Sequence, residues 1–356
     1  MHVAQFDRMT LTPFARRDAA LSVVIICVDI LAYAAVVYAA LVSDAIWLKL
    51  LFAFGAGTMI ALMAIAGHDA AHQSFSHSKR LNRIFGTIAF LPALHPYSLW
   101  ELHHNRVHHR FTAQIGLDNA FPPMTVEQYS AASPMRRAYY RFLRSLWGQP
   151  WFYLVDIWLP QVYLPFGKND PKISAETWFD LILVYGYTVA FAVICMSLAH
   201  ARADGFWPMI EALLFAFVIP FLIWNVFISF LSIVQHTGPD VRWLMPTGQP
   251  STADQALAGT VHVVLPEPID WLFHRIMQHP AHHINVGIPL HRLKRAETQL
   301  EATEKRALVR VWTPAYHWRL TRDCQLYEPI ANRWVRFADL TRPAAKSDAP
   351  DRAAAA

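Results

Sequence analysis

The sequence has little charge and very little cysteine. Charged residues make up 16% of its 356 residues, against about 25% in an ordinary soluble domain. Hydrophobic residues make up 54%, and the mean hydropathy is +0.23. This balance argues against a soluble globular protein and against a disordered one. The three cysteines, Cys27, Cys195 and Cys324, are far apart and form no CxxC pair. Their placement excludes a disulfide scaffold and a thiolate metal site.

Because charged residues are few, long apolar stretches contain almost none of them. A helix that spans a bilayer needs about 20 apolar residues, and four stretches are long enough: residues 20–42, 46–67, 179–200 and 210–235. A large soluble protein with buried helices is the alternative, but such runs are rare outside membranes. The first stretch contains Asp29. A carboxylate inside a span is costly, so we expect Asp29 to be hydrogen-bonded in a structural role.

The flanking regions predict the orientation. The first 17 residues are polar, with Arg16 and Arg17 directly before the first stretch and no cleavable signal peptide, so we expect a cytoplasmic N-terminus. Two further apolar stretches, 84–100 and 146–166, are broken by prolines and rich in aromatic residues. They are expected to lie in the membrane interface without crossing. We expect two kinds of interfacial residue. Trp47, Trp100, Trp178 and Trp207 are expected as belt residues near the span ends, and His77, His95 and His200 are expected at the interface.

Histidine is the residue type that stands out. Half of the 18 histidines fall in three boxes, His68-Asp-Ala-Ala-His72, His103-His104-Asn-Arg-Val-His108-His109 and His279-Pro-Ala-His282-His283, and His236 directly follows the fourth stretch. Residues three or four apart share one face of a helix, and imidazole is a ligand of iron, zinc, copper and nickel. The set is too large for one ion and fits two. It comprises His68, His72, His104, His108, His109, His236, His279, His282 and His283.

The predicted topology is consistent with a shared metal site. Two spans precede His68, and two more separate His109 from His279. If residues 84–100 do not cross, all three boxes lie on the cytoplasmic side of the membrane.

The boxes HDAAH, HHNRVHH and HPAHH resemble those of the membrane fatty acid desaturases. The sequence segments around the boxes are similar to those of acyl-lipid omega-6 (Δ12) desaturases of the cyanobacterial type. These segments are HDAAHQSFS, IAFLPALHPYSLWELHH, LDNAF at 117–121, IVQHT at 233–237, GTVH at 259–262 and HHINVGIP at 282–289. The resemblance covers about residues 60 to 335. Its boxes are shared with membrane hydroxylases, ketolases and alkane monooxygenases.

This resemblance implies a fold and an activity. The fold is an all-α integral membrane protein with four transmembrane helices, interfacial helices and a cytoplasmic, histidine-rich di-iron cap. One domain covers 1–341, with the cap at 68–178 and 236–341, and 342–356 is a disordered tail. The activity is O₂-dependent desaturation of a lipid-linked acyl chain at the omega-6 (Δ12) position. The bacterial inner membrane is the expected location, with both termini and the active site in the cytoplasm.

The resemblance also assigns residues. Box one supplies His68 and His72, box two His104, His108 and His109, box three His279, His282 and His283, and His236 is the further ligand between boxes two and three. Asp118 is a candidate to orient a ligating imidazole from behind, with a loop turn as its alternative. His262 and His274 are candidates for the surroundings of the irons.

Box two departs from the commoner HxxHH spacing. Each residue of an α-helix turns about 100°, so His109 points about 100° away from the face of His104 and His108. Either His109 serves the second iron from another angle, or a one-residue π-bulge between Asn105 and Val107 restores a compact face. We expect the bulge. His103, the alternative ligand, points about 140° away from His108.

The chemistry needs electrons from outside the chain. Removing hydrogen from an unactivated methylene requires an oxidant made from O₂ and hence a redox metal, for which a histidine-rich shell suits iron. The sequence has no cytochrome b5 signature, no GxGxxG loop and no cysteine set for an iron–sulfur cluster, so a separate carrier such as ferredoxin is implied. No nucleic-acid partner is expected. Basic cap residues could dock an acidic carrier or meet lipid headgroups, namely Arg106, Arg110, Arg136, Arg137, Arg292, Lys294 and Arg295.

Three alternatives remain. The same di-iron site could hydroxylate or otherwise oxidise an acyl chain or a terpenoid. A metal-ion transporter would hold its ligands near the membrane midplane, whereas these boxes follow the span ends. A non-catalytic metal-binding scaffold is the third.

Overall fold

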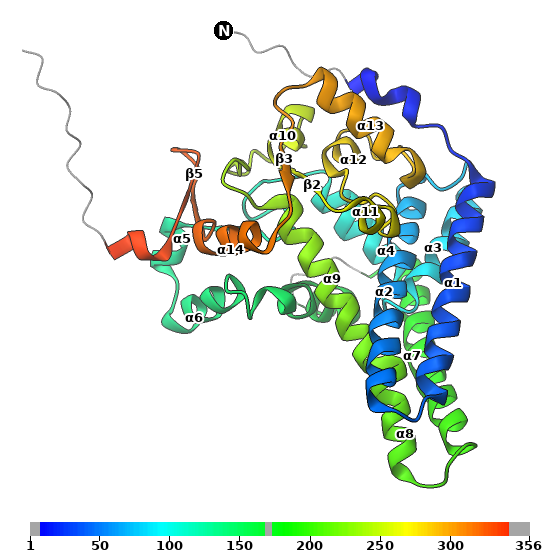
Figure 1. Ribbon diagram of the computed structural model, residues 1–356. Helices are drawn as coiled ribbons and strands as arrows, with labels where there is room; N and C mark the ends of the chain where they lie inside the picture. Colours follow the sequence, from blue (N-terminus) through cyan, green and yellow to red (C-terminus); the bar gives the residue numbers. More distant parts are fainter. Residues whose placement is uncertain (1–7, 168–172, 342–356) are drawn as a thin grey trace, which may run out of the picture.

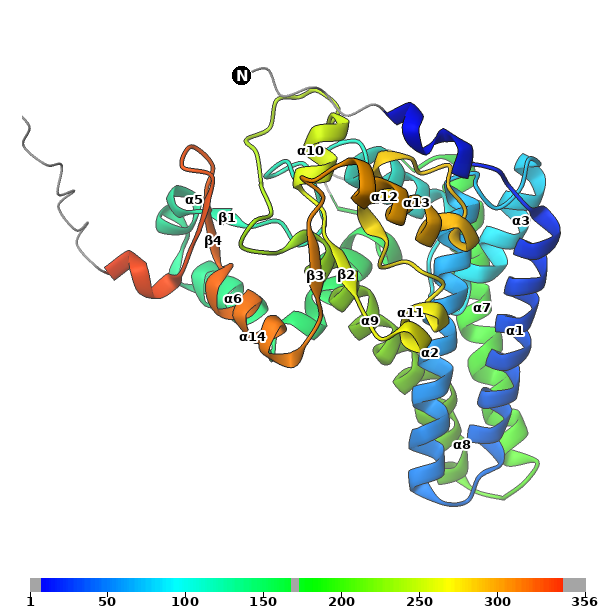
Figure 2. The same ribbon diagram turned by 45° about the horizontal axis from the view of Figure 1, so that its top comes forward.

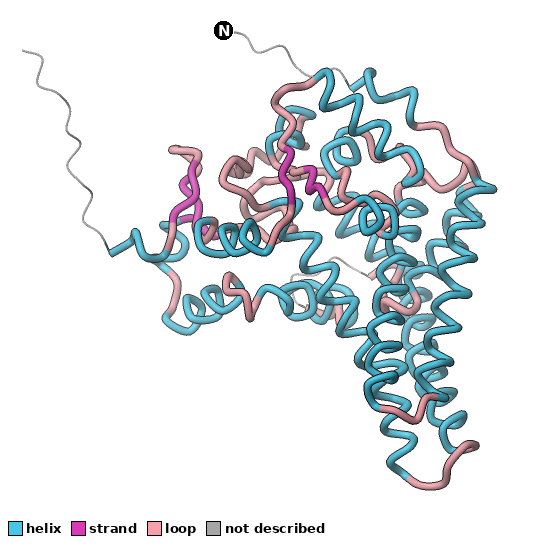
Figure 3. Tube along the Cα trace, in the orientation of Figure 1, coloured by secondary structure: helices cyan, strands magenta, loops and turns pink. Residues whose placement is uncertain are grey.

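The computed structural model describes residues 8–167 and 173–341, and within these ranges the chain is mostly helical (Figures 1 and 3). Its α-helices are α1 (Ala19–Val42), α2 (Ile46–Ala71), α3 (Lys79–Phe90), α4 (Tyr97–Trp100), α5 (Val126–Ala131), α6 (Pro134–Leu143), α7 (Ala175–His200), α8 (Phe206–Leu213), α9 (Ile219–His236), α10 (Ala253–Ala258), α11 (Glu267–Leu272), α12 (His279–Ile284), α13 (Leu290–Thr303) and α14 (Pro314–Asp323). Its π-helices are η2 (Glu101–His108), η4 (Tyr153–Tyr163) and η5 (Leu214–Val218), and its 3-10 helices are η1 (Arg8–Phe14), η3 (Gln149–Trp151) and η6 (Phe337–Thr341). Its strands are β1 (Met124–Thr125), β2 (His262–Val264), β3 (Val309–Val311), β4 (Leu326–Glu328) and β5 (Arg333–Val335). The tail at 342–356, predicted to be disordered, lies outside the described residues.

Two helical hairpins form a stem, in the lower part of Figure 1. One hairpin is α1 and α2. The other is α7 and the continuous run α8–η5–α9, which covers Phe206–His236. Of the described residues, these four helices are long and apolar enough to cross a membrane, and their most apolar 18-residue windows have mean hydropathies of 2.0 to 2.6. The prediction of four helices of membrane-spanning length and composition is therefore confirmed, and each boundary agrees with the prediction to within about one helical turn.

Burial differs among the four helices, and it identifies α2 as the central one. Its most apolar window is 67% buried, against 28% for α1 and 17% for α7. A Cβ added at Gly57 would lie 2.6 Å from Ile223 and 2.8 Å from the carbonyl oxygen of Pro220. Glycine thus lets α2 and α9 approach closely, as small residues do between membrane helices. Leu31 on α1 and Ile182 on α7 are exposed, which suits contact with lipid tails.

A cap covers the upper ends of α2 and α9 (Figures 1 and 2). It contains α3, α4, η2 and α10 to α13, together with a two-stranded parallel sheet in which His262 of β2 pairs with Val309 of β3. An arm extends to one side, built from α5, α6, α14 and a three-stranded sheet of order β1-β4-β5. In this sheet β1 and β4 are parallel, and β4 and β5 are antiparallel. These short strands were not expected in an all-α protein.

The two proline-broken stretches form no long helix. Helix α3 has 12 residues, about 18 Å at 1.5 Å per residue, which is shorter than the ~30 Å hydrocarbon core. The chain then turns through Leu94, whose φ is 54°, before α4 begins after Pro96. The second stretch is a π-helix, η4, with Pro160 inside it. Proline cannot donate a backbone hydrogen bond, which is consistent with the irregular winding there.

Candidate metal centre

The structure brings all nine predicted histidines together where the stem meets the cap. The last turns of α2 and α9 carry His68 and His236, and His72 and His109 directly follow α2 and η2. Helices η2 and α12 supply the rest. The ring nitrogens form two groups, and within each group the candidate ligand atoms lie within 4.8 Å of one another. Group one is His68, His72, His104, His109 and His282, and group two is His108, His236, His279 and His283.

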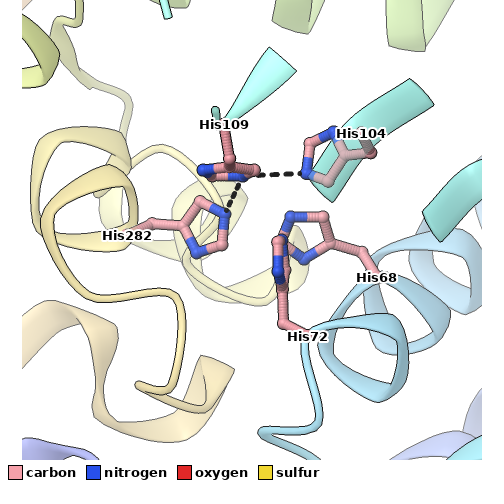
Figure 4. A group of neighbouring side chains, drawn as sticks. All are labelled: His68, His72, His104, His109 and His282. Carbon is pink, nitrogen blue, oxygen red and sulfur yellow. Dashed lines mark hydrogen bonds between the residues drawn. The ribbon is translucent and has the colours of Figure 1, made fainter. Parts of the chain in front are cut away.

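The rings of group one surround a common point (Figure 4). The Nε2 atom of His109 lies 3.1 Å from Nε2 of His104 and 3.1 Å from Nε2 of His282. His68 and His72 approach from the opposite side, with ring centroids 4.5 Å apart. All three boxes thus contribute to this group.

Group two is tighter. The Nε2 atom of His283 lies 3.1 Å from that of His108 and 2.9 Å from that of His279, and His279 Nε2 lies 2.8 Å from His236 Nε2. Two nitrogen ligands of one ion, each about 2.1 Å from it and at a right angle, would be about 3 Å apart. These spacings therefore match those of ligands that share an ion.

Partners behind group two set the ring tautomers. The Nδ1–H of His108 donates to Asp118 Oδ1 at 2.7 Å, that of His236 to the carbonyl oxygen of Gly259 at 3.1 Å, and that of His283 to Thr112 Oγ1 at 3.1 Å. Each bond leaves the lone pair of Nε2 free and directed at the other rings. This is the usual arrangement behind a metal-bound histidine. Burial raises the pKa of Asp118, but the interactions with His108 outweigh it and lower the pKa below its usual value.

The remaining electrostatics also fit a metal. Burial, followed by the neighbouring imidazoles, lowers the pKa of five cap histidines well below the ordinary value: His104, His109, His279, His282 and His283. These rings are neutral at neutral pH, as ligands must be.

Two ring nitrogens of group one, His68 Nδ1 and His72 Nε2, also lack a hydrogen-bond partner among the described residues. Buried polar atoms are rarely left unpaired, and an all-imidazole donor set suits iron or another transition metal.

The spacing of box two is explained by a π-helix. The backbone N–H of His109 donates to the carbonyl oxygen of His104 at 2.9 Å, five residues back. The expected departure from α-helical winding is therefore present, but η2 covers eight residues instead of one. His104 and His109 consequently join group one, and His108 joins group two, although His104 and His108 were expected to share a face.

Two of the candidates for the surroundings of the irons lie outside both groups. The Nε2 atom of His274 lies 2.8 Å from Asp29 Oδ2, which confirms the hydrogen bond expected for Asp29. The Nδ1 atom of His262 lies 2.5 Å from Glu301 Oε1.

Two aromatic residues expected at the membrane interface are buried, so those predictions were wrong. The Trp100 ring centroid lies 5.1 Å from that of His104 and 4.7 Å from that of Phe90. His95 Nδ1 donates to the carbonyl oxygen of Ala93 at 2.6 Å, and Tyr153 Oη donates to His95 Nε2 at 2.8 Å. Both residues follow the turn after α3, which brings them beneath the boxes. Pro92, which lies in that turn, marks it in the sequence, but it does not show which side chains the turn buries.

A mainly apolar cavity of about 100 Å³ lies against both groups. Its walls include Ile65, Ile157 and Trp224, and it reaches His104 of group one and His236 of group two. Such a cavity can hold a short segment of an apolar chain, with its methylenes next to the histidines.

Helix α13 ties two boxes together. At its start, the N–H of Leu290 donates to Oδ2 of Asp69, between His68 and His72, at 2.8 Å. Further along, Glu297 Oε2 accepts the N–H of Ala281 in box three at 2.8 Å.

Comparison with known proteins agrees with this site. Residues 45–315 match the family described as fatty acid desaturase. The chain is 29% identical over 311 residues to the sn-1 oleoyl-lipid 12-desaturase of Picosynechococcus sp., which covers 84% of this chain and 82% of that protein. It is 29% identical to the protein of the same name from Synechocystis sp., over 77% of this chain and 74% of the relative. It is 28% identical to the chloroplastic omega-6 fatty acid desaturase of Brassica napus, over 82% of this chain and 63% of the relative.

Proposed function

Because this chain belongs to the fatty acid desaturase family and is an oxidoreductase, we propose that it uses O₂ to introduce a double bond into a lipid-linked fatty acyl chain at the omega-6 (Δ12) position. The names of the cyanobacterial and chloroplast relatives support the position and the lipid-linked substrate. The observation that carries the proposal is the apolar cavity that touches histidines of both groups.

The proposed cofactor is a pair of iron ions, one held by each histidine group. When bound, the irons would supply the O₂-derived oxidising power that takes two hydrogens from neighbouring methylenes. Two features support the assignment. The donors are imidazoles only, which suits iron. The two groups are also neighbours, because adjacent residues of one box belong to different groups, as His108 and His109 do and as His282 and His283 do.

The protein's own residues have defined tasks in this proposal. Asp118 holds the His108 ring with its Nε2 lone pair directed at group two. The walls of the cavity, such as Ile65 and Ile157, exclude water and align the acyl chain. The acyl chain would enter from the bilayer, since residues of stem helices α2 and α9 line the cavity.

The proposed orientation places the cap and both termini in the cytoplasm, with the arm resting on the membrane interface, in a bacterial inner membrane. The exposed side chains of the arm support this placement. Met135 on α6 is 82% exposed and Trp147 is 84% exposed, and Arg136 and Arg137 stand beside Met135. Apolar and aromatic side chains next to arginines are typical of interfacial helices. A separate electron carrier such as ferredoxin completes the proposal.

The test is expression in a host that makes only saturated and monounsaturated acyl chains, followed by fatty-acid profiling. Dienoic acyl chains with the new bond at the omega-6 position are expected. Hydroxylated or keto products in their place would instead identify a hydroxylase or ketolase with the same site.

A further inference from the structure

A third group of metal-ligating side chains lies in the cap, apart from the nine histidines. It consists of His262 on β2 and of Glu297 and Glu301 on α13, and its candidate ligand atoms lie within 4.8 Å of one another. The elements β2, α12 and α13 lie together in the cap (Figures 1 and 2). None of the three residues belongs to either histidine group.

The backbone fixes this geometry. Glu297 and Glu301 are four residues apart on α13 and so share one face of the helix. His262 is held opposite them because β2 pairs with β3, with the N–H of His262 donating to the carbonyl oxygen of Leu308 at 2.8 Å. The Nδ1 atom of His262 lies 2.5 Å from Glu301 Oε1.

Glu297 is the residue whose environment is unexplained. It is 1% exposed, and while its Oε2 accepts the N–H of Ala281, its Oε1 has no partner in the described part of the chain. Among the described residues no lysine or arginine forms an ion pair with Glu297 or Glu301. A buried carboxylate without a cation is costly, and burial raises the pKa of Glu297 to about 8.

We propose that His262, Glu297 and Glu301 bind one divalent transition-metal ion, with Zn²⁺ as the best match. One imidazole nitrogen and two carboxylate oxygens are accepted zinc ligands, and a water completes the tetrahedron. Mg²⁺ and Ca²⁺ prefer all-oxygen sites, and Zn²⁺ binds such ligands more tightly than Mn²⁺ or Fe²⁺. On binding, two protons leave to solvent, the one shared by His262 and Glu301 and the one that the carboxyl of Glu297 carries at neutral pH, and the ion takes their place among the three side chains.

The role assigned to this ion is structural. Glu297 already holds the backbone of Ala281, between His279 and His282. An ion that fixes Glu297 to His262 therefore joins α13 and β2 behind box three.

Metal analysis of the purified full-length protein tests this proposal. The protein is equilibrated with excess Zn²⁺, passed through a desalting column, and its zinc and iron are counted by mass spectrometry. Zn²⁺ can also enter the histidine groups, so the decisive quantity is the difference between variants. Glu301→Gln and His262→Gln are each expected to hold one zinc ion per chain fewer than the wild type, with unchanged iron.

The matched control is Glu304→Gln. Glu304 lies at the end of the same helix but bonds to Arg306, so this variant is expected to bind as much zinc as the wild type. Glu301 is at the edge of the group, with 33% of its side chain exposed, so its substitution is tolerated by the fold. Equal zinc in the wild type, Glu301→Gln and His262→Gln would overturn the proposal and leave a proton as the bridge. The count does not depend on desaturation, so a failure of the proposed activity is distinguishable from a failure of this site.

Discussion

The carboxylate of Asp118 lies 2.7 Å from His108 Nδ1 and also accepts the backbone N–H groups of Ala113 and Ala120. Since two backbone bonds hold the carboxylate, its position does not depend on what group two binds. Asp118 therefore orients the His108 ring, which is the role considered for Asp118 from the LDNAF segment at 117–121.

Replacing Asp118 by asparagine removes the charge that fixes the His108 tautomer. Loss of such a partner weakens metal binding by about 10- to 100-fold, and we expect reduced iron content and reduced product in proportion. The control is Asp240→Asn, because Asp240 is exposed and pairs with Arg310 on the surface. Full iron occupancy in Asp118→Asn at limiting iron would contradict the orienting role.

His236 is isolated in the sequence but belongs to group two. His236→Ala leaves three imidazoles there, and we expect less bound iron and no dienoic product. Iron analysis and fatty-acid profiling measure the two effects. His77→Ala is the control, since His77 is exposed and contacts Arg17 instead. Normal activity of His236→Ala would remove this residue from the site.

The neighbours His103 and His104 differ in position. His104 lies in group one, whereas His103 lies outside both groups. His104→Ala is therefore expected to lose more iron than His103→Ala when both proteins are purified in the same way. The reverse order would show that box two uses the other histidine.

Tyr153 supports His95 in the wall of the cavity. Burial lowers the pKa of His95 to about 4, so the ring is neutral and needs the tyrosine hydroxyl as a donor. Tyr153→Phe leaves a buried acceptor unpaired, which costs about 1–3 kcal/mol. We expect a lower unfolding temperature with unchanged iron content. A parallel loss of iron would mean that Tyr153 acts on the metal groups.

The buried carboxyl of Glu297 predicts that the stability of the metal-free protein depends on pH. Its folded-state pKa is raised by burial to about 8, from an ordinary value of 4.5. The native state therefore binds more protons than the unfolded state between these values, and stability falls as pH rises from about 4.5 to 8. Glu297→Gln should show a smaller fall, and the difference between the two unfolding curves isolates this residue from the titrating histidines. Identical pH profiles would show that Glu297 does not titrate in this range.

The sequence predicts those features that depend on local composition and spacing. Four spans follow from apolar runs, and the histidine set follows from the boxes. The division of that set does not, because each group mixes boxes: His108 and His109 are adjacent in the chain but lie in different groups. That division depends on the winding of η2, which is a π-helix over eight residues, whereas spacing arguments assume α-helical winding. The pairing of β2 with β3 joins segments 47 residues apart at His262 and Val309, and three-residue strands carry no periodic signal.

Group one combines His68, in the last turn of the first helical hairpin, with His282, in the C-terminal part of the chain. The Asp69–Leu290 hydrogen bond joins the same two regions. During synthesis, box one thus emerges from the ribosome more than 200 residues before box three exists. The first hairpin must insert and persist without box three, and a nascent chain that stops before residue 279 lacks ligands of both groups. Assembly of the metal centre is therefore a late step in the biogenesis of this protein, later than the insertion of all four helices.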